Sequence, residues 1–305
     1  MYLDEIFSPL WRTSAIFGMT SVFIHNKKVV CSKIKLLYSV AYVTVCVIGM
    51  LIFFTQMTTS MQPELSKLKS IRLLIALHSI GIFILMVFII LFVIIKWSRV
   101  IDEIRKIRVV DLELYRLDQR DNVVRSNQKI RRLTIATLVL VQVGFNVLGV
   151  LYSSGTKHDK QIIYFLIMSL PRLVLSNMII IFCVIVQVLH SRFRIVNLVQ
   201  SKLKPKSDDF CSTVDHILSL HKILVRISRT VNSIFSIQLL LWIAGDFILI
   251  VGDLYAAMVI VFVRTLSTHF HVFLGLMKNC LLLGLELFYL SKVCRDLCFE
   301  VSSNE

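Results

Sequence analysis

The sequence lacks the residues and motifs that would mark it as a flexible chain or an enzyme. It contains 4 prolines and 10 glycines in 305 residues, which argues against a disordered or repeat protein. It has no Gly-rich phosphate loop, no Gly-x-Ser-x-Gly and no His-Glu-x-x-His. We therefore predict no catalytic residue, no enzymatic activity and no cofactor.

Cysteines are few and are not placed for disulfides or a metal. Of the 7 cysteines, none falls in a connection that we expect outside the cell, so no disulfide framework is expected. Cys294 and Cys298 share a helix face, but no set of histidine ligands lies near them. His216 and His221 are five residues apart and lie on different helix faces. The sequence thus predicts no metal site.

Acidic residues are also scarce. There are 19 Asp and Glu against 34 Lys and Arg, a formal net charge of +15. Most of the basic residues lie between long apolar runs, which is typical of segments that face anionic lipid headgroups and the cytosol. No basic patch is interleaved with aromatic residues as in a nucleic-acid binder. We predict the lipid bilayer as a partner, and no nucleic acid.

What the sequence has in abundance is apolar residues. They make up 56% of the chain, and the mean hydropathy is +0.78. A helix crosses about 30 Å of hydrocarbon at about 1.5 Å per residue, and an alternating barrel pattern is absent. We therefore predict an all-α, polytopic membrane helical bundle in which 1–305 form a single transmembrane domain. The six expected transmembrane helices are 36–57, 73–95, 133–152, 162–189, 236–262 and 266–290.

The distribution of Lys and Arg predicts the orientation of this bundle. Most of them fall before residue 36, in the long connections 96–132 and 191–231, and in the tail. The positive-inside rule then places the N-terminus in the cytosol of a multi-pass plasma-membrane protein. Apolar residues recur every three to four positions in both connections, so we expect helices that extend beyond the membrane. Two interpretations stay open: a charged face in contact with water or lipid, or a cytosolic helical bundle that joins subunits.

Two aspartates interrupt the apolar segment 232–255. Asp246 and Asp253 are seven residues apart and therefore share a helix face. A charged side chain at the centre of a membrane costs at least a few kcal/mol, so this face should look into the protein or into a water-filled cavity. The two interpretations, a structural pair with a neighbouring helix and a role in binding a ligand or ion, are equally open.

Several short patterns together carry a resemblance to a known family. Ser8-Pro9-Leu10 followed by Phe17-Gly18, and Phe193-Arg194 with Asn197-Leu198, are two of them. The clearest runs from His216 and His221 through Val231-Asn232 and Phe235-Ser236 to Leu254-Tyr255. In these patterns, and in the order of its apolar runs, most of the chain resembles an insect gustatory receptor.

The resemblance implies a taste receptor that is a ligand-gated cation channel subunit. It would bind a small-molecule tastant in the outer half of the helix bundle and assemble as a homo- or hetero-tetramer with other gustatory receptor subunits. The family has a seventh, pore-lining helix with a Thr-Tyr-x5-Gln-Phe motif, which this sequence does not match. We therefore expect the pore helix to be missing. A fragment, an incomplete gene model and a decayed receptor all remain open as the reason.

The orientation and the resemblance together point to a candidate ligand-binding site. Polar and aromatic residues at similar depth in the outer half of the bundle are its members: Arg172, Asp253, Asn146, His78, His271, Trp242 and Tyr255. Arg172 and Asp253 are expected to pair, because a buried pair costs far less than two lone charges. Deeper in the bundle, Lys278 and Asp246 are able to pair, and Glu286 lies near the cytosolic end; we interpret these residues mostly as packing and gating elements. For each residue, a structural helix-to-helix hydrogen bond is the alternative.

Two other classes of membrane protein are alternatives. In a secondary transporter the intramembrane charges would carry substrate or protons, but the expected internal repeat between the two halves is not visible. A G-protein-coupled receptor is opposed by the charge distribution and by the lack of Asp-Arg-Tyr and Asn-Pro-x-x-Tyr motifs.

Overall fold

The computed structural model describes residues 3–16, 22–25, 28–31, 37–45, 47–49, 51, 69–153, 161–203, 210–262 and 266–302. Helices dominate these residues. Their bounds are α1 (Leu3–Ile16), α4 (Lys69–Arg116), α5 (Arg120–Ser153), α6 (Gln161–Lys202), α7 (Phe210–Phe262) and α8 (Leu266–Ser302). Residues 37–45 and 47–49 are also helical.

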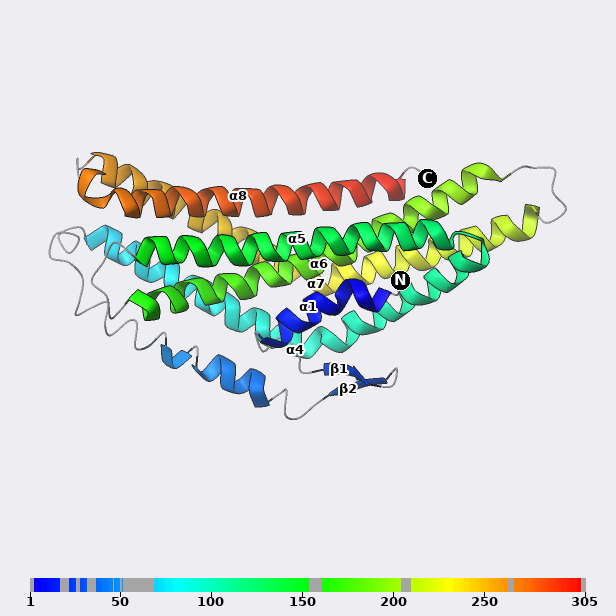
Figure 1. The fold of residues 1–305 in the computed structure, drawn as a ribbon, viewed down its shortest axis with the longest axis horizontal. Helices are drawn as coiled ribbons and strands as arrows, with labels where there is room; N and C mark the ends of the chain where they lie inside the picture. The colour runs from blue at the N-terminus through cyan, green and yellow to red at the C-terminus, as the bar shows by residue number, and fades with distance from the viewer. Residues whose placement is uncertain are drawn as a thin grey trace.

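The five long helices α4 to α8 run side by side and alternate in direction, forming an elongated bundle (Figure 1). Helix α6 lies at its centre and contacts α1, α4, α5, α7 and α8. Its residues 174–186 are all buried, as expected of a helix that is apolar on every side. The apolar composition of this helix therefore sets the architecture, because its neighbours must surround it.

The number of membrane-spanning helices is confirmed only in part. By length and composition, Arg172–Lys202 and Cys211–Val259 can each cross a membrane. A third span results if Phe83–Phe92 and Ile95–Arg116, whose axes differ by 56°, count as one. Among the described residues no other helix meets this test: Leu37–Gly49 is apolar but shorter, and residues 52–57 lie outside the described part of the chain. Six spans are therefore not confirmed.

The expected helical extensions are present and continuous with the apolar helices. Helix α4 continues to Arg116 and α7 begins at Phe210. A tight turn joins α4 to α5 at Asp118, which has φ 58°. The backbone N–H of Gln119 donates to the backbone carbonyl of Leu114 at 3.0 Å, and the backbone N–H of Asp118 donates to that of Tyr115 at 3.2 Å. This pairing is a Schellman motif, in which aspartate tolerates the left-handed backbone better than most residues.

A buried ion pair fastens these extensions together. The Arg192 guanidinium of α6 donates from Nε to Asp111 Oδ1 of α4 at 2.6 Å, and from Nη2 to Oδ2 at 3.1 Å. Its Nη2 also donates to Asn127 Oδ1 of α5 at 2.6 Å. Arg192 and Asn127 are fully buried. The extensions thus pack as a helical bundle within one chain, and whether that bundle joins subunits stays a prediction.

Helix α1 packs against α5 and α6, which the sequence did not predict. Its buried residues Leu3, Ile6, Phe7 and Leu10 follow helical spacing and form one apolar face. The Asn177 amide of α6 donates to Ser14 Oγ at 3.0 Å, and the Thr13 hydroxyl donates to Asn177 Oδ1 at 2.9 Å. The N-terminal helix is therefore part of the bundle.

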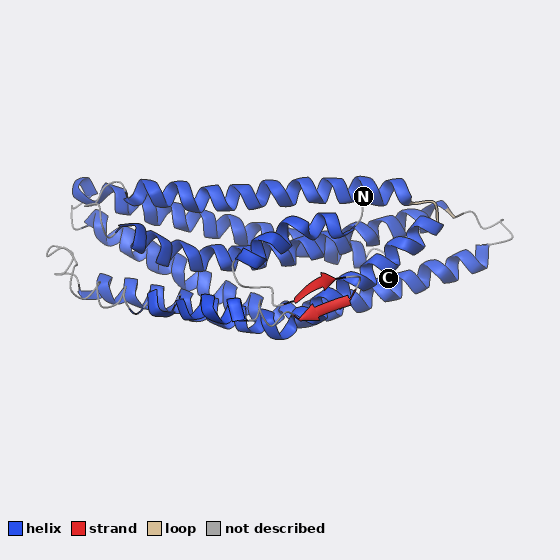
Figure 2. Cartoon of the chain, turned by 60° about the horizontal axis from the view of Figure 1, so that its bottom comes forward, coloured by secondary structure: helices blue, strands red, loops and turns tan. Residues whose placement is uncertain are grey.

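Among the described residues the structure is all-helical as predicted, apart from one short hairpin. Strands β1 (Val22–His25) and β2 (Lys28–Cys31) pair antiparallel, with Val22 opposite Cys31 and His25 opposite Lys28 (Figure 2). Each strand is rich in β-branched residues, which favour extended backbone. Four-residue strands are too short for an alternating pattern to stand out in the sequence.

Gly245 marks a close approach between α7 and α4. A Cβ at this position would meet the Leu85 Cδ2 atom at 3.2 Å. We expect Gly245→Ala to change the free energy of unfolding by less than about 1 kcal/mol, because the end of Leu85 can shift and alanine favours the helix. Gly245→Val should destabilise by about 1–3 kcal/mol through overpacking. Thermal melts of the purified variants test this, and equal melting temperatures for the two would contradict it.

Candidate functional site

Buried charges gather between α6, α7 and α8. Arg172 of α6 is buried, as are Asp246 and Asp253 of α7, so the shared face of the two aspartates points inward as the sequence predicts. Asp253, Asp246 and Glu286 of α8 each lie near enough to Arg172 to attract its guanidinium. One guanidinium therefore faces three carboxylates; we call Arg172, Asp246, Asp253 and Glu286 the charged cluster.

Only some of the carboxylate oxygens of the charged cluster accept hydrogen bonds from the described residues. The Ser176 hydroxyl, one turn after Arg172, donates to Glu286 Oε1 at 2.6 Å. Asp246 Oδ2 is buried and accepts no hydrogen bond from the described residues. A pair between Lys278 and Asp246 is not formed in the described part of the chain; Lys278 instead experiences repulsion from Arg172. The cluster is thus rich in acceptors and poor in donors.

The other expected site residues have varied positions. Trp242 is buried in α7, one turn before Asp246. Tyr255 is 49% exposed and lies on the surface of α7, so the structure does not bring it into the charged cluster. The side chains of His78, Asn146 and His271 lie outside the described residues, and their place in the site stays a prediction.

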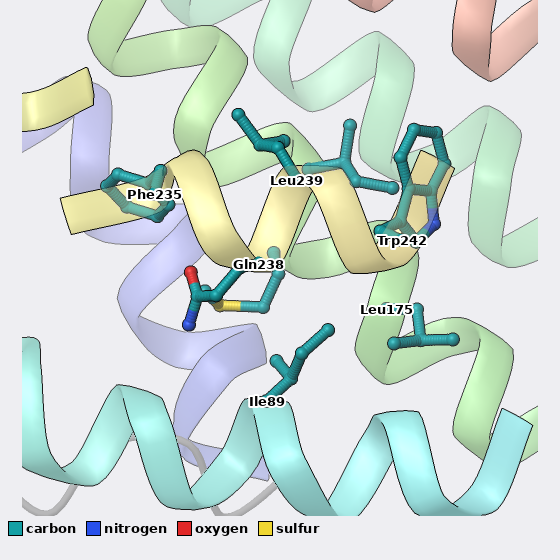
Figure 3. Close-up of a pocket in the computed structure, with 8 residues that line it drawn as sticks. Ile89, Leu175, Phe235, Gln238, Leu239 and Trp242 are labelled. Carbon is teal, nitrogen blue, oxygen red and sulfur yellow. The ribbon is translucent and has the colours of Figure 1, made fainter. Parts of the chain in front are cut away.

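A small cavity adjoins the charged cluster. Its lining residues come from α4, α6 and α7: Ile89, Leu175, Met178, Ile179, Phe235, Gln238, Leu239 and Trp242 (Figure 3). The cavity volume is about 10 Å³, the lower limit for one water molecule. Since Trp242 and Asp246 are four residues apart on α7, the cavity and the charged cluster are neighbours along that helix.

Gln238 is the polar group of this cavity. Its side chain is 4% exposed, and neither its Oε1 nor its Nε2 has a hydrogen-bond partner among the described residues. An unsatisfied buried polar group costs about 1–3 kcal/mol. The amide can both donate and accept, so a molecule that enters with one hydroxyl, amide or carbonyl would recover that free energy.

Sequence reasoning missed Gln238, although a signal was present. It is a single amide within the apolar run 237–244, where a polar residue must face either protein or lipid. The two aspartates in the same helix give a stronger signal, because burying a charge costs more free energy than burying a neutral amide.

Comparisons with known proteins agree with a membrane receptor. The family model described as 7tm Chemosensory receptor matches residues 7–301. No curated protein matches the chain.

Proposed function

The chain belongs to the 7tm chemosensory receptor family, and we propose that it is a gustatory receptor, a subunit of a ligand-gated cation channel in the plasma membrane. This family is not an enzyme family. The membership supports the resemblance to chemosensory receptors on which the sequence interpretation rested. The tastant-binding and channel activities are the proposal, together with assembly into a tetramer with other gustatory receptor subunits.

The observation that carries the proposal is the unpartnered Gln238 amide in an apolar cavity beside the charged cluster. Ligand sites are mostly apolar, with a few polar groups that fix the orientation of the ligand. The walls of the cavity and the amide supply both. A suitable tastant is a small molecule with an apolar body and one or two hydrogen-bonding groups, which Gln238 would bind while Arg172 or Asp253 contacts a second group.

The small size of the cavity suggests how binding produces a signal. A volume of about 10 Å³ admits a water molecule but no tastant. A ligand must therefore separate α4, α6 and α7, so it binds the widened state more tightly than the closed one. Such a difference in affinity is what shifts a conformational equilibrium. In this proposal the widened state is the one that conducts.

Ligand-evoked current tests the role of Gln238. With sugars and bitter compounds as a panel, we expect Gln238→Leu to raise the concentration for half-maximal current by roughly 2- to 12-fold, since a hydrogen bond contributes about 0.5–1.5 kcal/mol. Removing an unpartnered amide should not impair folding, so surface expression should stay normal. The matched control is Gln200→Leu at an exposed position of α6. Unchanged responses in Gln238→Leu at normal expression would contradict this site.

A further inference from the structure

The exposed apolar surfaces of α5 and α8 each end at a row of exposed basic residues, which we call a basic stripe. On α5, Arg125, Lys129 and Arg132 are exposed and recur at spacings of four and three, so they share a face. On α8, Lys292 and Arg295 are exposed and are likewise one turn apart. We call these five residues the basic strip.

Exposed apolar residues continue both stripes in the direction of the bundle centre. On α5 they are Ile135 and Val139, three and seven residues beyond Arg132. On α8 they are Leu281, Leu285 and Phe288, which lie four to eleven residues before Lys292. An apolar surface that stops at a row of cations is the pattern of a helix crossing from acyl chains into the headgroup layer.

A hydrogen-bonded tyrosine fixes the relative height of the two helices. The Gln187 amide of α6 donates to the Tyr289 hydroxyl at 2.7 Å, and Tyr289 lies next to Thr137 of α5. Lys292 is three residues beyond Tyr289 and Arg132 is five residues before Thr137. At about 1.5 Å per residue the two cations lie within about 3 Å of the same level.

The two stripes also face the same side of the α5–α8 contact. Helices α5 and α8 run antiparallel and side by side (Figure 1). With Thr137 and Tyr289 turned toward each other, a rotation of about 100° per residue brings Lys129, Arg132 and Lys292 to one side. Arg131, which points the other way, lies 3.7 Å from Glu5 of α1. Packed helices are about 8–10 Å apart, which long basic side chains from both can span.

The charges of the basic strip are mostly not neutralised by the protein. Among the described residues, Arg125, Lys129, Arg132 and Lys292 form no ion pair, while Arg295 lies 3.4 Å from Asp296. Two cations of α4 differ, since Lys106 pairs with Glu103 and Arg116 with Glu113. The strip therefore carries a surplus of positive charge that begins at the common level of Arg132 and Lys292.

We propose that the basic strip, Arg125, Lys129 and Arg132 of α5 with Lys292 and Arg295 of α8, binds the headgroup of a phosphoinositide. Four unneutralised cations suit a headgroup that carries several phosphates rather than a single one. The exposed apolar residues above the strip would contact the acyl chains of the same lipid. Because α5 and α8 both contact α6, such a lipid would hold two helices of the bundle together. The inference depends on the membrane placement of the chain and not on the identity of its tastant.

Binding of a fluorescent short-chain phosphatidylinositol bisphosphate to the detergent-solubilised full chain tests the proposal. We expect the triple variant Lys129→Gln, Arg132→Gln, Lys292→Gln to weaken binding by on the order of 100-fold, at about 1 kcal/mol per basic residue. The matched control removes the same charge from exposed positions elsewhere, by Arg116→Gln, Lys222→Gln and Arg226→Gln. The control should weaken binding less than about twofold, and Lys129→Arg with Lys292→Arg should retain it.

Three outcomes would overturn the proposal. Equal loss in the control variant would mean that the overall charge of the protein attracts the lipid. Unchanged binding in the strip variant would remove the site. Displacement of the lipid by an equal concentration of soluble inositol trisphosphate would show that a free phosphate compound, and not a lipid, is the ligand. Because every substituted residue is exposed, thermal melts should show all variants folded.

Discussion

Arg192→Ala is expected to destabilise the receptor by about 3–5 kcal/mol, enough to abolish most folded protein at the cell surface. The substitution leaves the Asp111 carboxylate, which is buried, without the guanidinium that binds both of its oxygens. It also deprives Asn127 Oδ1 of its donor. A thermal melt of the detergent-solubilised protein, followed by size-exclusion chromatography, measures the loss.

Two variants separate this effect from a general sensitivity to lost charge. Arg108 lies 3.5 Å from Asp4, and both side chains are about half exposed, so Arg108→Ala should cost at most about 1 kcal/mol. The double variant Asp111→Leu with Arg192→Met removes both buried charges and should recover most of the stability. A melt of Arg192→Ala that matches that of Arg108→Ala would contradict the role assigned to the buried pair.

The sequence alone could not predict this ion pair. Arg192 and Arg194 stand two residues apart in the same apolar and basic segment, yet one is fully buried and the other exposed. The partner of Arg192 is 81 residues away on α4, so the choice depends on how α4 and α6 are aligned. Periodicity shows which residues share a face of one helix, but it does not show which neighbour that face meets.

The helices were easier to predict than their packing partners. Long apolar runs give the positions of α4 to α8, because few other structures satisfy the backbone in a bilayer. The burial of Asp246 and Asp253 followed from the cost of exposing a carboxylate to lipid. The docking of α1 was missed because its fourteen residues are too few to span a membrane. Its short apolar face gives no indication that α5 and α6 form the surface it covers.

The second large loss of stability is expected from a substitution in the charged cluster. Arg172→Gln is expected to destabilise by about 3–5 kcal/mol, since Asp253, Asp246 and Glu286 would then face one another without the guanidinium that attracts all three. Asp246→Asn should lower the free energy of unfolding by less than about 1 kcal/mol. It removes one of three carboxylates that share a single guanidinium, and its Oδ2 has no partner among the described residues. Thermal melts of the two variants measure the asymmetry, and equal losses would contradict it.

Ligand-evoked current decides between the two roles that the sequence leaves open for these charges. A structural cluster predicts that ligand-evoked current falls only as far as the amount of folded receptor at the surface falls. A ligand-binding cluster predicts a further loss of sensitivity per folded receptor, for Arg172→Lys as well, because lysine keeps the charge but lacks the planar fork of five donors. Arg172→Lys is therefore the decisive variant. It should fold nearly normally, so a changed response in that variant cannot be attributed to a loss of folded protein. We expect reduced sensitivity, since Arg172 lies only three residues from Leu175 in the wall of the cavity.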